Sequence, residues 1–373
     1  MEKKTKQVIG VVIVLGVVTG GLLYYIRFPN LLSESILIES NQDFEDHGWP
    51  GNGTVFNPYV ISGKTIYPSE DRSCIEIRNT TVFFTIESCY LESAYGEPAL
   101  LFVDVENAKI QDCTIVSRAR CISLSEVSSS TFTYNSFSGV VRGDEIIGHE
   151  GIFGIGGGLN VFSQNRFLNI RMTALYLIQM SFCFILNNTI SNAEEGIRLS
   201  ECTDSHISGN EIENLGYAGF EGTGISVGSS VDITVEDNSI HNNVGHGIQV
   251  FSSSDCEISE NIIQDNEQGG IFTEDSDSVY VRNCTIANNG GDGIEFNGTS
   301  VFFRADTCRV ENSHIHHNSG SGINFNFIVN GDANNNQIEF NNEWGIHMNE
   351  CETTTESNNT FDSNTLGDVY EEP

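Results

Sequence analysis

The sequence predicts an all-β solenoid, a single-stranded parallel β-helix of about 12 rungs, preceded by one transmembrane helix. Three observations support this prediction. A Gly-Ile pair returns at a nearly constant interval through the second half of the chain. Apolar and polar residues alternate in short runs between these pairs, and a continuous apolar run lies close to the amino terminus.

The repeat is about 23 residues long. Gly-Ile begins at residues 196, 224, 247, 270, 293, 322 and 345. About fourteen residues after most of these glycines comes an Asn that is followed two positions later by an apolar residue. The Asn position is occupied in turn by Cys89, Cys113, Asn135, Asn165, Asn188, Asn210, Asn238, Asn261, Cys284, Ser313, Asn336 and Asn359.

Within each repeat the apolar residues alternate with polar ones over three to five positions, as in Gly247-Ile-Gln-Val. This is the period of short β-strands. Strands of this length cannot bury a face alone, but they can when each turn of the chain stacks on the next. The repeat therefore predicts one rung of a solenoid.

Residues 1–30 are expected to form a cytoplasmic stub and a transmembrane signal anchor. The apolar run from Val8 to Ile26 has 19 residues, enough to span a bilayer. Three lysines precede it and Arg27 alone follows it, which places the amino terminus inside. The expected location is the cell membrane, single-pass, with an extracytoplasmic body. A cleaved signal peptide is the alternative.

The remaining chain is expected to contain an N-terminal cap and first turn over residues 31–73, the β-helix over 74–365 and an acidic tail over 366–373. A cap is needed because the first rung of a solenoid otherwise exposes an open sheet edge. The residues from Ser40 to Phe44 and from Trp49 to Thr54 are the candidates for it.

The charge balance argues against nucleic acid as a partner. The chain has 17 Lys and Arg against 51 Asp and Glu, and residues 31–373 carry a formal charge of −37. Such a body repels phosphate backbones.

The recurring Asn is expected to be structural. Stacked Asn side chains can hydrogen-bond along the axis and satisfy the backbone of the turns. Cys89, Cys113 and Cys284 occupy the same position and are therefore expected to be small buried groups. A disulfide between Cys89 and Cys113, on adjacent rungs, remains open.

The pattern of Gly-Ile, a Ser- or Asp-rich turn and Asn-x-Ile over residues 36–365 resembles the PbH1 repeat of right-handed parallel β-helix proteins, the pectin-lyase-like and NosD-like group. The resemblance implies a right-handed parallel β-helix. The resemblance does not identify one function, because the group contains polysaccharide lyases, hydrolases, epimerases and non-catalytic surface proteins.

The repeat also locates one outward-facing row. The side chain of Ile in each Gly-Ile strand points inward, so the next residue faces solvent. This row is expected to read Glu76, Leu101, Ser123, Phe153, Tyr176, Arg198, Ser226, Gln249, Phe272, Glu295, Asn324 and His347.

Two rungs are longer than the others and are expected to carry loops beside this row. One loop runs from Ser138 to Glu150 and the other from Leu215 to Thr223. Between them the row reads Phe153, Tyr176 and Arg198, so a groove with an aromatic floor is predicted. The expected substrate-binding residues are Phe153, Tyr176, Arg198, Tyr217 and Phe220.

Such a groove suits a sugar chain, because aromatic faces stack on pyranose rings and Arg can hold a uronate carboxylate by two hydrogen bonds. Acid–base chemistry or glycoside cleavage would draw on the loop residues beside it. The catalytic candidates are Arg198, Asp144, Glu145, His149, Glu150 and Glu221. The competing interpretation is a set of solvated loops.

Two further patterns bear on chemistry. Five carboxylates on neighbouring rungs are candidates for Ca²⁺, which takes six to eight oxygen ligands: Glu274, Asp275, Asp277, Asp292 and Glu295. Gly245-His246-Gly247 resembles a motif of polygalacturonase-like hydrolases, but the accompanying Asp motifs are missing. His314, His316 and His317 are expected to point in different directions and to share no metal.

The sequence therefore predicts a surface β-helix that binds or displays a polysaccharide. A polysaccharide lyase or glycoside hydrolase is the first alternative, and a non-catalytic structural surface protein or adhesin is the second. Whether the protein is an enzyme is left open.

Overall fold

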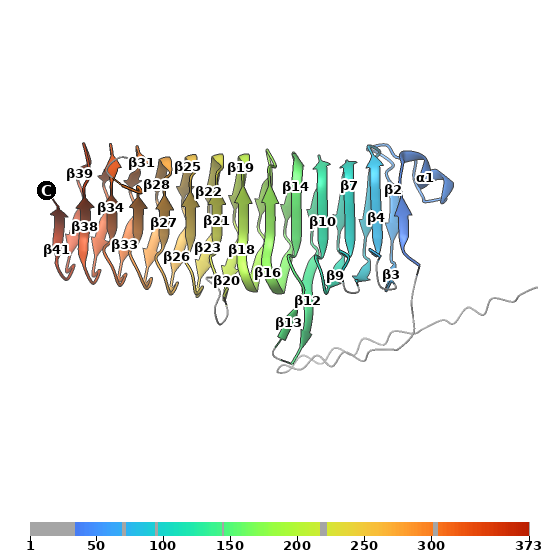
Figure 1. Cartoon of the computed structure of the whole chain (residues 1–373), viewed down its shortest axis with the longest axis horizontal. Helices are drawn as coiled ribbons and strands as arrows, with labels where there is room; N and C mark the ends of the chain where they lie inside the picture. Colours follow the sequence, from blue (N-terminus) through green and yellow to red (C-terminus); the bar gives the residue numbers. More distant parts are fainter. Residues whose placement is uncertain are drawn as a thin grey trace, which may run out of the picture. The chain divides into compact units, whose positions relative to one another are not determined.

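A computed structural model describes residues 34–68, 72–93, 96–143, 145–216, 222–300 and 305–372. These residues belong to the unit that begins at Leu32 and form a parallel β-solenoid (Figure 1). Successive strands of each turn lie on three sheets, which we call the Gly-Ile sheet, the second sheet and the third sheet.

The Gly-Ile sheet contains the strands that carry the Gly-Ile repeat. They are β1 (Ile36–Ile38), β4 (Ile75–Thr80), β7 (Leu100–Glu106), β10 (Ile122–Ser128), β14 (Ile152–Gly158), the later parts of β16 (Arg166–Ile178) and β18 (Thr189–Ser200), β21 (Ile225–Gly228), β24 (Ile248–Phe251), β27 (Ile271–Glu274), β30 (Ile294–Asn297), β34 (Ile323–Asn326), β38 (Trp344–Asn349) and β41 (Gly367–Glu371).

The second sheet follows the first along each turn. It contains β2 (Tyr59–Ser62), β5 (Phe84–Glu87), β8 (Ala108–Gln111), β11 (Thr131–Thr133), β15 (Val161–Ser163), β17 (Phe184–Leu186), β19 (Thr203–Ser208), β22 (Val231–Glu236), β25 (Ser254–Ser259), β28 (Asp277–Arg282), β32 (Arg309–Glu311), β36 (Asp332–Asn334) and β39 (Thr355–Ser357).

The third sheet closes each turn. It contains β3 (Thr65–Ile66), β6 (Tyr90–Glu92), β9 (Thr114–Ser117), β12 (Ser136–Arg142), the first parts of β16 and β18, β20 (Glu211–Glu213), β23 (Ser239–His241), β26 (Ile262–Gln264), β29 (Thr285–Ala287), β33 (His314–His316), β37 (Gln337–Glu339) and β40 (Thr360–Asp362). Outside the three sheets, β31 (Ala305–Asp306) pairs with β35 (Ile328–Val329), and β13 (Glu145–Ile147) pairs antiparallel with β12.

The described residues form about thirteen turns, because the second sheet has 13 strands. The expected number, about 12, was wrong because the first turn lacks the repeat. Ile36 of β1 pairs with Ile75 of β4, 39 positions later, since the short helix α1 (Asn41–Asp46) and a loop are inserted in that turn.

The Gly of the repeat is needed because neighbouring turns approach closely. A Cβ atom on Gly247 would lie 2.8 Å from the carbonyl oxygen of Gly270 on the next turn. The Gly247 amide itself donates to the Gly269 carbonyl, at 3.1 Å. Any larger residue would therefore separate the turns.

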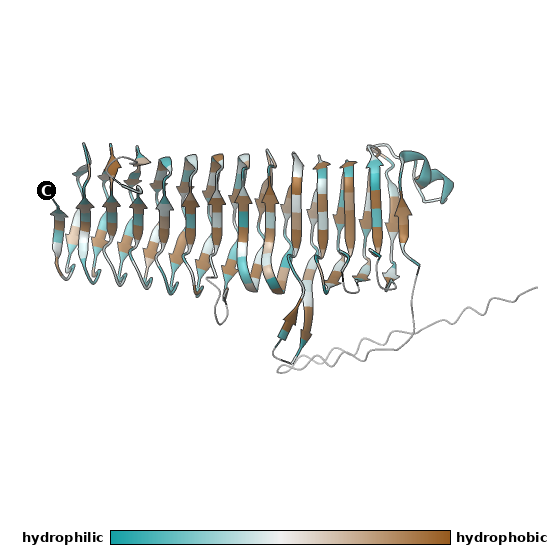
Figure 2. Ribbon diagram, viewed as in Figure 1, coloured by the Kyte–Doolittle hydropathy of each residue, from teal (hydrophilic) through white to brown (hydrophobic). Residues whose placement is uncertain are grey.

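The core consists of inward side chains that repeat in register from turn to turn. Ile225, Ile248, Ile271 and Ile294 are partners on four consecutive strands, and all are fully buried. Figure 2 shows the corresponding alternation of hydrophobic and hydrophilic residues along the strands. Aromatic stacks fill the same core, as between Phe132 and Phe162, whose ring centroids are 5.1 Å apart.

The Asn ladder has the structural role that the sequence predicts. The side-chain oxygen of Asn238 accepts hydrogen bonds from the backbone and side-chain nitrogens of Asn210, both at 2.9 Å. Its Nδ2 donates to Ile207 O and to the side chain of Asn261. Each Asn therefore satisfies buried backbone groups at one corner of the turn and hydrogen-bonds to the equivalent Asn of the next turn.

A second ladder runs parallel to the first and was not predicted. It lies five residues later in each turn, and all its members are buried: Asn243, Asn266, Asn289, Asn318, Asn341 and Asn364. Consecutive members are joined by Nδ2-to-Oδ1 hydrogen bonds of 2.9–3.0 Å. Two corners of the turn are thus each fixed by a ladder of hydrogen-bonded Asn side chains.

The cysteines behave as small core residues. Cys89, Cys113 and Cys284 are buried at the Asn position, as expected. All ten cysteines of the chain are free, so Cys89 and Cys113 form no disulfide. Burial raises the pKa of the Cys256 and Cys308 thiols to about 12, and such thiols are unreactive at neutral pH.

The helix α1 covers the amino-terminal end of the core. Its Phe44 is fully buried and stacks on Tyr59, with ring centroids 5.0 Å apart. Phe44 also contacts the ring of Phe84, on the next turn of the second sheet. The first turn is thereby shielded from solvent.

The expected transmembrane helix is not found. Among the described residues, no helix is long and apolar enough to cross a membrane. The segment on which that helix was predicted, residues 1–30, lies outside the described residues.

We predict that Asn238→Ala lowers the free energy of unfolding by about 2–4 kcal/mol, because several buried backbone and side-chain groups lose their partners. Chemical denaturation of the full chain measures this change. Glu211→Ala, an exposed outward position on β20 of the preceding turn, is the control and should change stability by less than about 0.5 kcal/mol. Equal effects of the two substitutions would contradict a stabilising ladder.

Candidate functional site

The strand register aligns the expected row of the Gly-Ile sheet, although Ser226 within it is buried and does not face solvent. Phe153 pairs with Tyr176, Tyr176 with Arg198, and Arg198 with Ser226. The same register continues to His347 and adds Tyr370 beyond it. Three predicted binding residues, Phe153, Tyr176 and Arg198, are therefore direct neighbours on consecutive turns.

Arg120 contacts Phe153. Its guanidinium carbon lies 3.9 Å from the centroid of the Phe153 ring, and its Nε is 2.9 Å from a carboxylate oxygen of Glu150. Glu150 is buried, whereas Arg120 is 39% exposed at its side chain. The buried carboxylate fixes the guanidinium over the ring and leaves its other edge accessible.

Arg198 forms a second pair of this kind with Tyr176. Its guanidinium carbon lies 5.2 Å from the Tyr176 ring centroid. Its Nη1 is 3.7 Å from Glu195, which accepts a hydrogen bond of 2.9 Å from Thr173. Nε of Arg198 is buried and has no hydrogen-bond partner among the described residues.

Glu195, which pairs with Arg198, and its neighbour Glu194, which lies near Arg171, both have perturbed pKa values. Burial raises the pKa of Glu195 above its usual value, against the opposing effects of Arg198 and Thr173. Burial and the neighbouring charge of Glu195 raise the pKa of Glu194. Perturbed acids next to a cation are frequent at functional sites.

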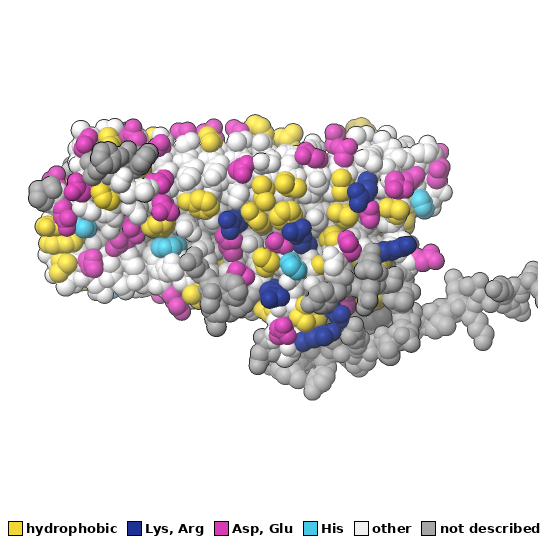
Figure 3. All heavy atoms as spheres, in the orientation of Figure 1, with side chains coloured by type: hydrophobic (Ala, Val, Ile, Leu, Met, Phe, Trp, Pro, Cys, Tyr) yellow, Lys and Arg dark blue, Asp and Glu magenta, His cyan; other side chains and the backbone are white. Residues whose placement is uncertain are grey.

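Basic residues are concentrated around this row. Of the 13 Lys and Arg in residues 31–373, six lie between residues 118 and 198: Arg118, Arg120, Arg142, Arg166, Arg171 and Arg198. Figure 3 shows basic side chains among hydrophobic ones over the middle of this face. The same stretch holds six Asp and Glu, so it is formally neutral, whereas the rest of the body is strongly acidic, and it repels a negatively charged ligand less than the other surfaces do.

The first predicted loop is a β-hairpin. Strands β12 and β13 pair from Val140 to Ile147 and project from the stack below β14 and β16 (Figure 1). Glu145 and His149 are exposed on it, and Arg142 pairs in register with Glu145. Glu150 is not a free loop carboxylate, because it is buried against Arg120. Asp144 lies outside the described residues.

The second predicted loop cannot be placed, because Tyr217, Phe220 and Glu221 also lie outside the described residues. Sequence reasoning missed Arg120, Glu195 and Thr173 as partners of the row. Arg120 precedes its strand and does not share a position in the repeat with Arg198. Glu195 directly precedes a Gly-Ile pair, which is the signal that could have identified it.

The five predicted calcium ligands do not form one cluster. Asp275 hydrogen-bonds to Thr299, and Asp277 lies on the second sheet, where it accepts a hydrogen bond from the Asp306 amide. Asp292, Glu295 and Glu274 lie close enough to influence one another. Among the described residues, no group of three or more His, Cys, Asp or Glu is arranged to hold a metal ion.

His246 is integrated in the fold. Its Nδ1 accepts a hydrogen bond of 3.1 Å from the Gly269 amide on the next turn, and its ring stacks on Phe272 at 4.9 Å between centroids. These contacts give the Gly-His-Gly motif a structural role.

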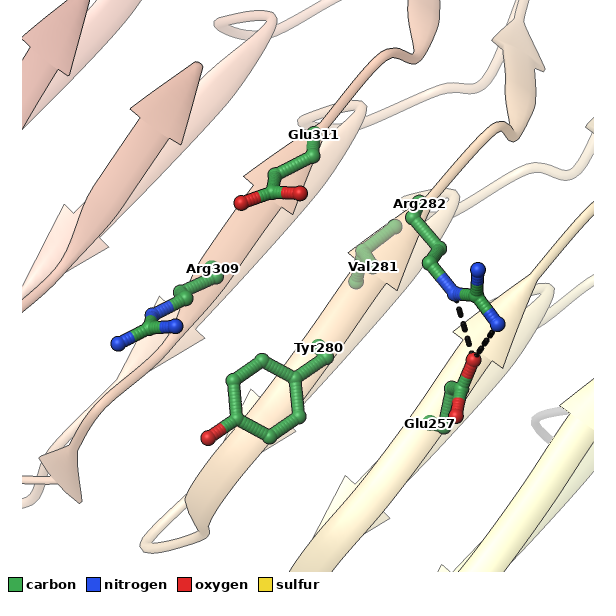
Figure 4. Close-up of a pocket in the computed structure, with 6 residues that line it drawn as sticks. All are labelled: Glu257, Tyr280, Val281, Arg282, Arg309 and Glu311. Atoms are coloured by element: carbon green, nitrogen blue, oxygen red, sulfur yellow. Dashed lines mark hydrogen bonds and ion pairs between the residues drawn. The ribbon is translucent and has the colours of Figure 1, made fainter.

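A shallow hollow lies on the second sheet, over β25, β28 and β32 (Figure 4). Its volume is about 240 Å³, below the usual range for small-molecule pockets. Arg282 pairs with Glu257 across it, and the Arg309 guanidinium lies 5.5 Å from the Tyr280 ring centroid. Only one cation–ring pair is present here, so the Gly-Ile sheet is the stronger candidate.

Glu295 provides a test of the acidic cluster. Burial, together with the charge of Asp292, raises its pKa from 4.5 to about 7. The folded chain therefore binds this proton more tightly than the unfolded chain, and the stabilisation present below pH 4.5 is lost as the pH rises to 7.

We predict that Glu295→Gln removes this loss. Relative to the native chain, the variant should gain roughly 1–2 kcal/mol between pH 4.5 and pH 7.5, since solvent screening reduces the full effect of the shift. Denaturation at both pH values measures the difference. Glu257→Gln, on the second sheet, is the control, and a difference that does not depend on pH would refute a raised pKa.

Comparison with solved structures finds the same fold at low sequence identity. The Streptococcus pneumoniae surface protein and adhesin PfbA is 11% identical, with a TM-score of 0.58, and the match covers 89% of this chain and 100% of that one. The periplasmic alginate epimerase AlgG is 13% identical, with a TM-score of 0.55 and 84% of each chain covered.

The Dettilon tailspike protein is 14% identical, with a TM-score of 0.51, and the match covers 84% of this chain and 62% of that one. A comparison with curated protein sequences finds no match. The family model described as right handed beta helix region matches residues 98–224, 150–305 and 223–371. These matches together span most of the solenoid, and the chain belongs to the right-handed β-helix family.

Proposed function

We propose that the protein binds an acidic polysaccharide along the outward row of the Gly-Ile sheet, over Phe153, Tyr176 and Arg198. The observation that carries this proposal is the pair of guanidinium groups held over adjacent aromatic rings, Arg120 over Phe153 and Arg198 over Tyr176. Both pairs lie on one face of neighbouring turns, in a body that is otherwise acidic.

Arg198 is the expected anchor for a carboxylate. Its ion pair with Glu195 is long, at 3.7 Å, and its side chain is 38% exposed, so the guanidinium is accessible to a ligand. A uronate carboxylate could take two parallel hydrogen bonds from Arg198 while the sugar ring contacts Tyr176.

The arrangement favours a chain-like ligand over a small one. The row is built on an exposed sheet surface, where the residues of consecutive turns are spaced about 4.8 Å apart. A polymer that runs along the axis could contact several turns at once, and each weak contact would add to the affinity. The fold relation to an alginate epimerase agrees with this class of partner, although likeness at 13% identity shows the fold alone.

A lyase or hydrolase is the second candidate. The observation that favours it is Glu195, an acid with a raised pKa beside Arg198 and Thr173. A raised pKa lets a carboxyl group keep its proton to a higher pH, as a general acid requires. In this alternative the acid is Glu195 and not a loop residue such as Glu145 or His149.

The proposed ligand implies a place of action. Acidic polysaccharides of this kind are encountered at cell surfaces, and we therefore propose that the solenoid works outside the cytoplasm. An adhesin with the same fold agrees with this location. A purely structural surface protein is the remaining alternative and predicts no preference for sugars.

We predict that the full chain binds polyuronates on a glycan array and does not bind neutral glucans. Arg198→Ala should weaken the binding by roughly thirtyfold, because a charged hydrogen-bonded pair contributes about 2 kcal/mol. Arg198→Lys should recover only part of the affinity, since an ammonium lacks the planar fork. Tyr176→Ala should also weaken binding. The array is read with and without calcium.

Phe272→Ala is the matched control, because Phe272 occupies the same outward row three turns beyond Arg198 but carries no guanidinium. The affinity of the Phe272→Ala variant for polyuronate should equal that of the native chain. Incubation of bound polyuronate then tests catalysis: shortened or unsaturated products that disappear in Glu195→Gln would favour the enzyme. Equal binding of neutral and acidic sugars would refute the proposal.

A further inference from the structure

We propose that His316 and His317 form a binding site for a divalent transition-metal ion, and we expect Cu²⁺ to be bound most tightly. The site lies at the end of β33 on the third sheet. The Nδ1 atoms of the two imidazoles face one another at 2.9 Å. This proposal does not depend on the proposed polysaccharide site.

The backbone brings the two rings together. His314 and His316 flank the buried Ile315 on β33, so both side chains point outward. His317 follows with a positive φ of 57°, which turns the chain and returns its ring toward His316. His314 and His316 therefore share one direction, and the turn at His317 brings the third ring close to His316. The ring centroids of His314 and His316 are 4.1 Å apart, and those of His316 and His317 are 5.1 Å apart.

The separation of the two nitrogens suits a shared ion. Imidazole nitrogens bind such ions at about 2.0–2.1 Å, so two ligands at a right angle lie about 3 Å apart. Without an ion, the same geometry is a hydrogen bond in which one Nδ1 carries a proton. Binding requires only that this proton moves to Nε2 of the same ring, so both imidazoles stay neutral and no proton is released.

Neighbouring side chains hold the rings in place. Glu339, on β37 of the next turn, pairs in register with His316 and lies 2.9 Å from Nε2 of His314. The ring of Phe340 stacks on His317, with centroids 5.0 Å apart. Such outer partners fix the orientation of imidazole ligands and strengthen metal binding.

The charge state also suits a metal. An ordinary imidazole, with a pKa of about 6.5, is mostly neutral at neutral pH and so offers a lone pair to a metal. The acidic body, with a formal charge of −37 over residues 31–373, raises the local concentration of cations.

The set of ligands defines the class of ion. Because no third His, Cys, Asp or Glu among the described residues converges on the same point, water must complete the coordination. Two imidazoles favour Cu²⁺, Ni²⁺ and Zn²⁺ over Ca²⁺ and Mg²⁺, and Cu²⁺ is bound most tightly of these. The bound ion is therefore expected to exchange readily with ions in solution.

The chain contains its own control for this site. His241 occupies the position equivalent to His316 three turns earlier, through the register of Gln264 and Ala287. The next residue there is Asn242, with a φ of 58°. The substitution His317→Asn therefore recreates a pair that the same fold already accommodates, and its effect can be assigned to the lost nitrogen.

The test is a titration of the full chain, without a polyhistidine tag, with Cu²⁺, followed by calorimetry and electron paramagnetic resonance. We expect one tightest site with two nitrogen ligands in the native chain. His317→Asn should weaken this site by at least about tenfold and leave a one-nitrogen signal. His241→Asn should leave affinity and signal unchanged, and excess Ca²⁺ should not displace the copper.

Circular dichroism melting of each variant verifies that the solenoid is intact. Equal Cu²⁺ affinity in the native chain and in His317→Asn would overturn the proposal. It would also be overturned if His241→Asn weakened binding as strongly as His317→Asn, because the copper would then be held by dispersed surface histidines. If His317→Asn loses copper binding but keeps polyuronate binding, the copper site is independent of the polysaccharide site on the Gly-Ile sheet.

Discussion

Every turn of this solenoid has to satisfy backbone groups that are buried at its corners. The stacked Asn side chains do this, because each accepts from the turn before it and donates to the turn after it. The arrangement works only if the same corner returns at the same place, so the ladder fixes the register of all three sheets. The outward rows, including the arginines and aromatic rings, take their alignment from that register.

Most of the fold follows from the sequence for the same reason. The ladder of Asn and the Gly of each Gly-Ile pair are required at fixed intervals, and a fixed interval can be read without a structure. The second ladder, from Asn243 to Asn364, has the same period and could have been found by the same test. The first turn, expected within residues 31–73, could not be aligned with the repeat, because α1 and its loop break the interval between Ile36 and Ile75.

The candidate site was predictable only in part. Phe153, Tyr176 and Arg198 are found in one row because strand side chains alternate and the repeat aligns them. Arg120 and Glu195 reach the row from positions outside that alternation, so their contacts depend on side-chain conformations that a repeat does not encode. The same is true of His317, whose positive φ reverses the direction expected from alternation.

The ladder and the site are connected by a simple physical requirement. A rigid stack costs little reorganisation when a long ligand lies along it, since the contact residues already stand in register. The guanidinium groups over Phe153 and Tyr176 are fixed by their rings and by Glu150 and Glu195 before any ligand arrives. Arg and acidic residues balance in number over residues 118–198, in contrast to the acidic body, and this gives a negatively charged polymer one preferred face.

Hydroxyl-radical footprinting of the full chain with and without a polyuronate tests this account most directly. Oxidation of Phe153 and Tyr176 should fall when the polymer is added, while oxidation of Phe272 and of Tyr280 on the second sheet should not change. Protection of Tyr280 alone, or equal protection of all four residues, would contradict the assignment of the Gly-Ile sheet as the binding surface.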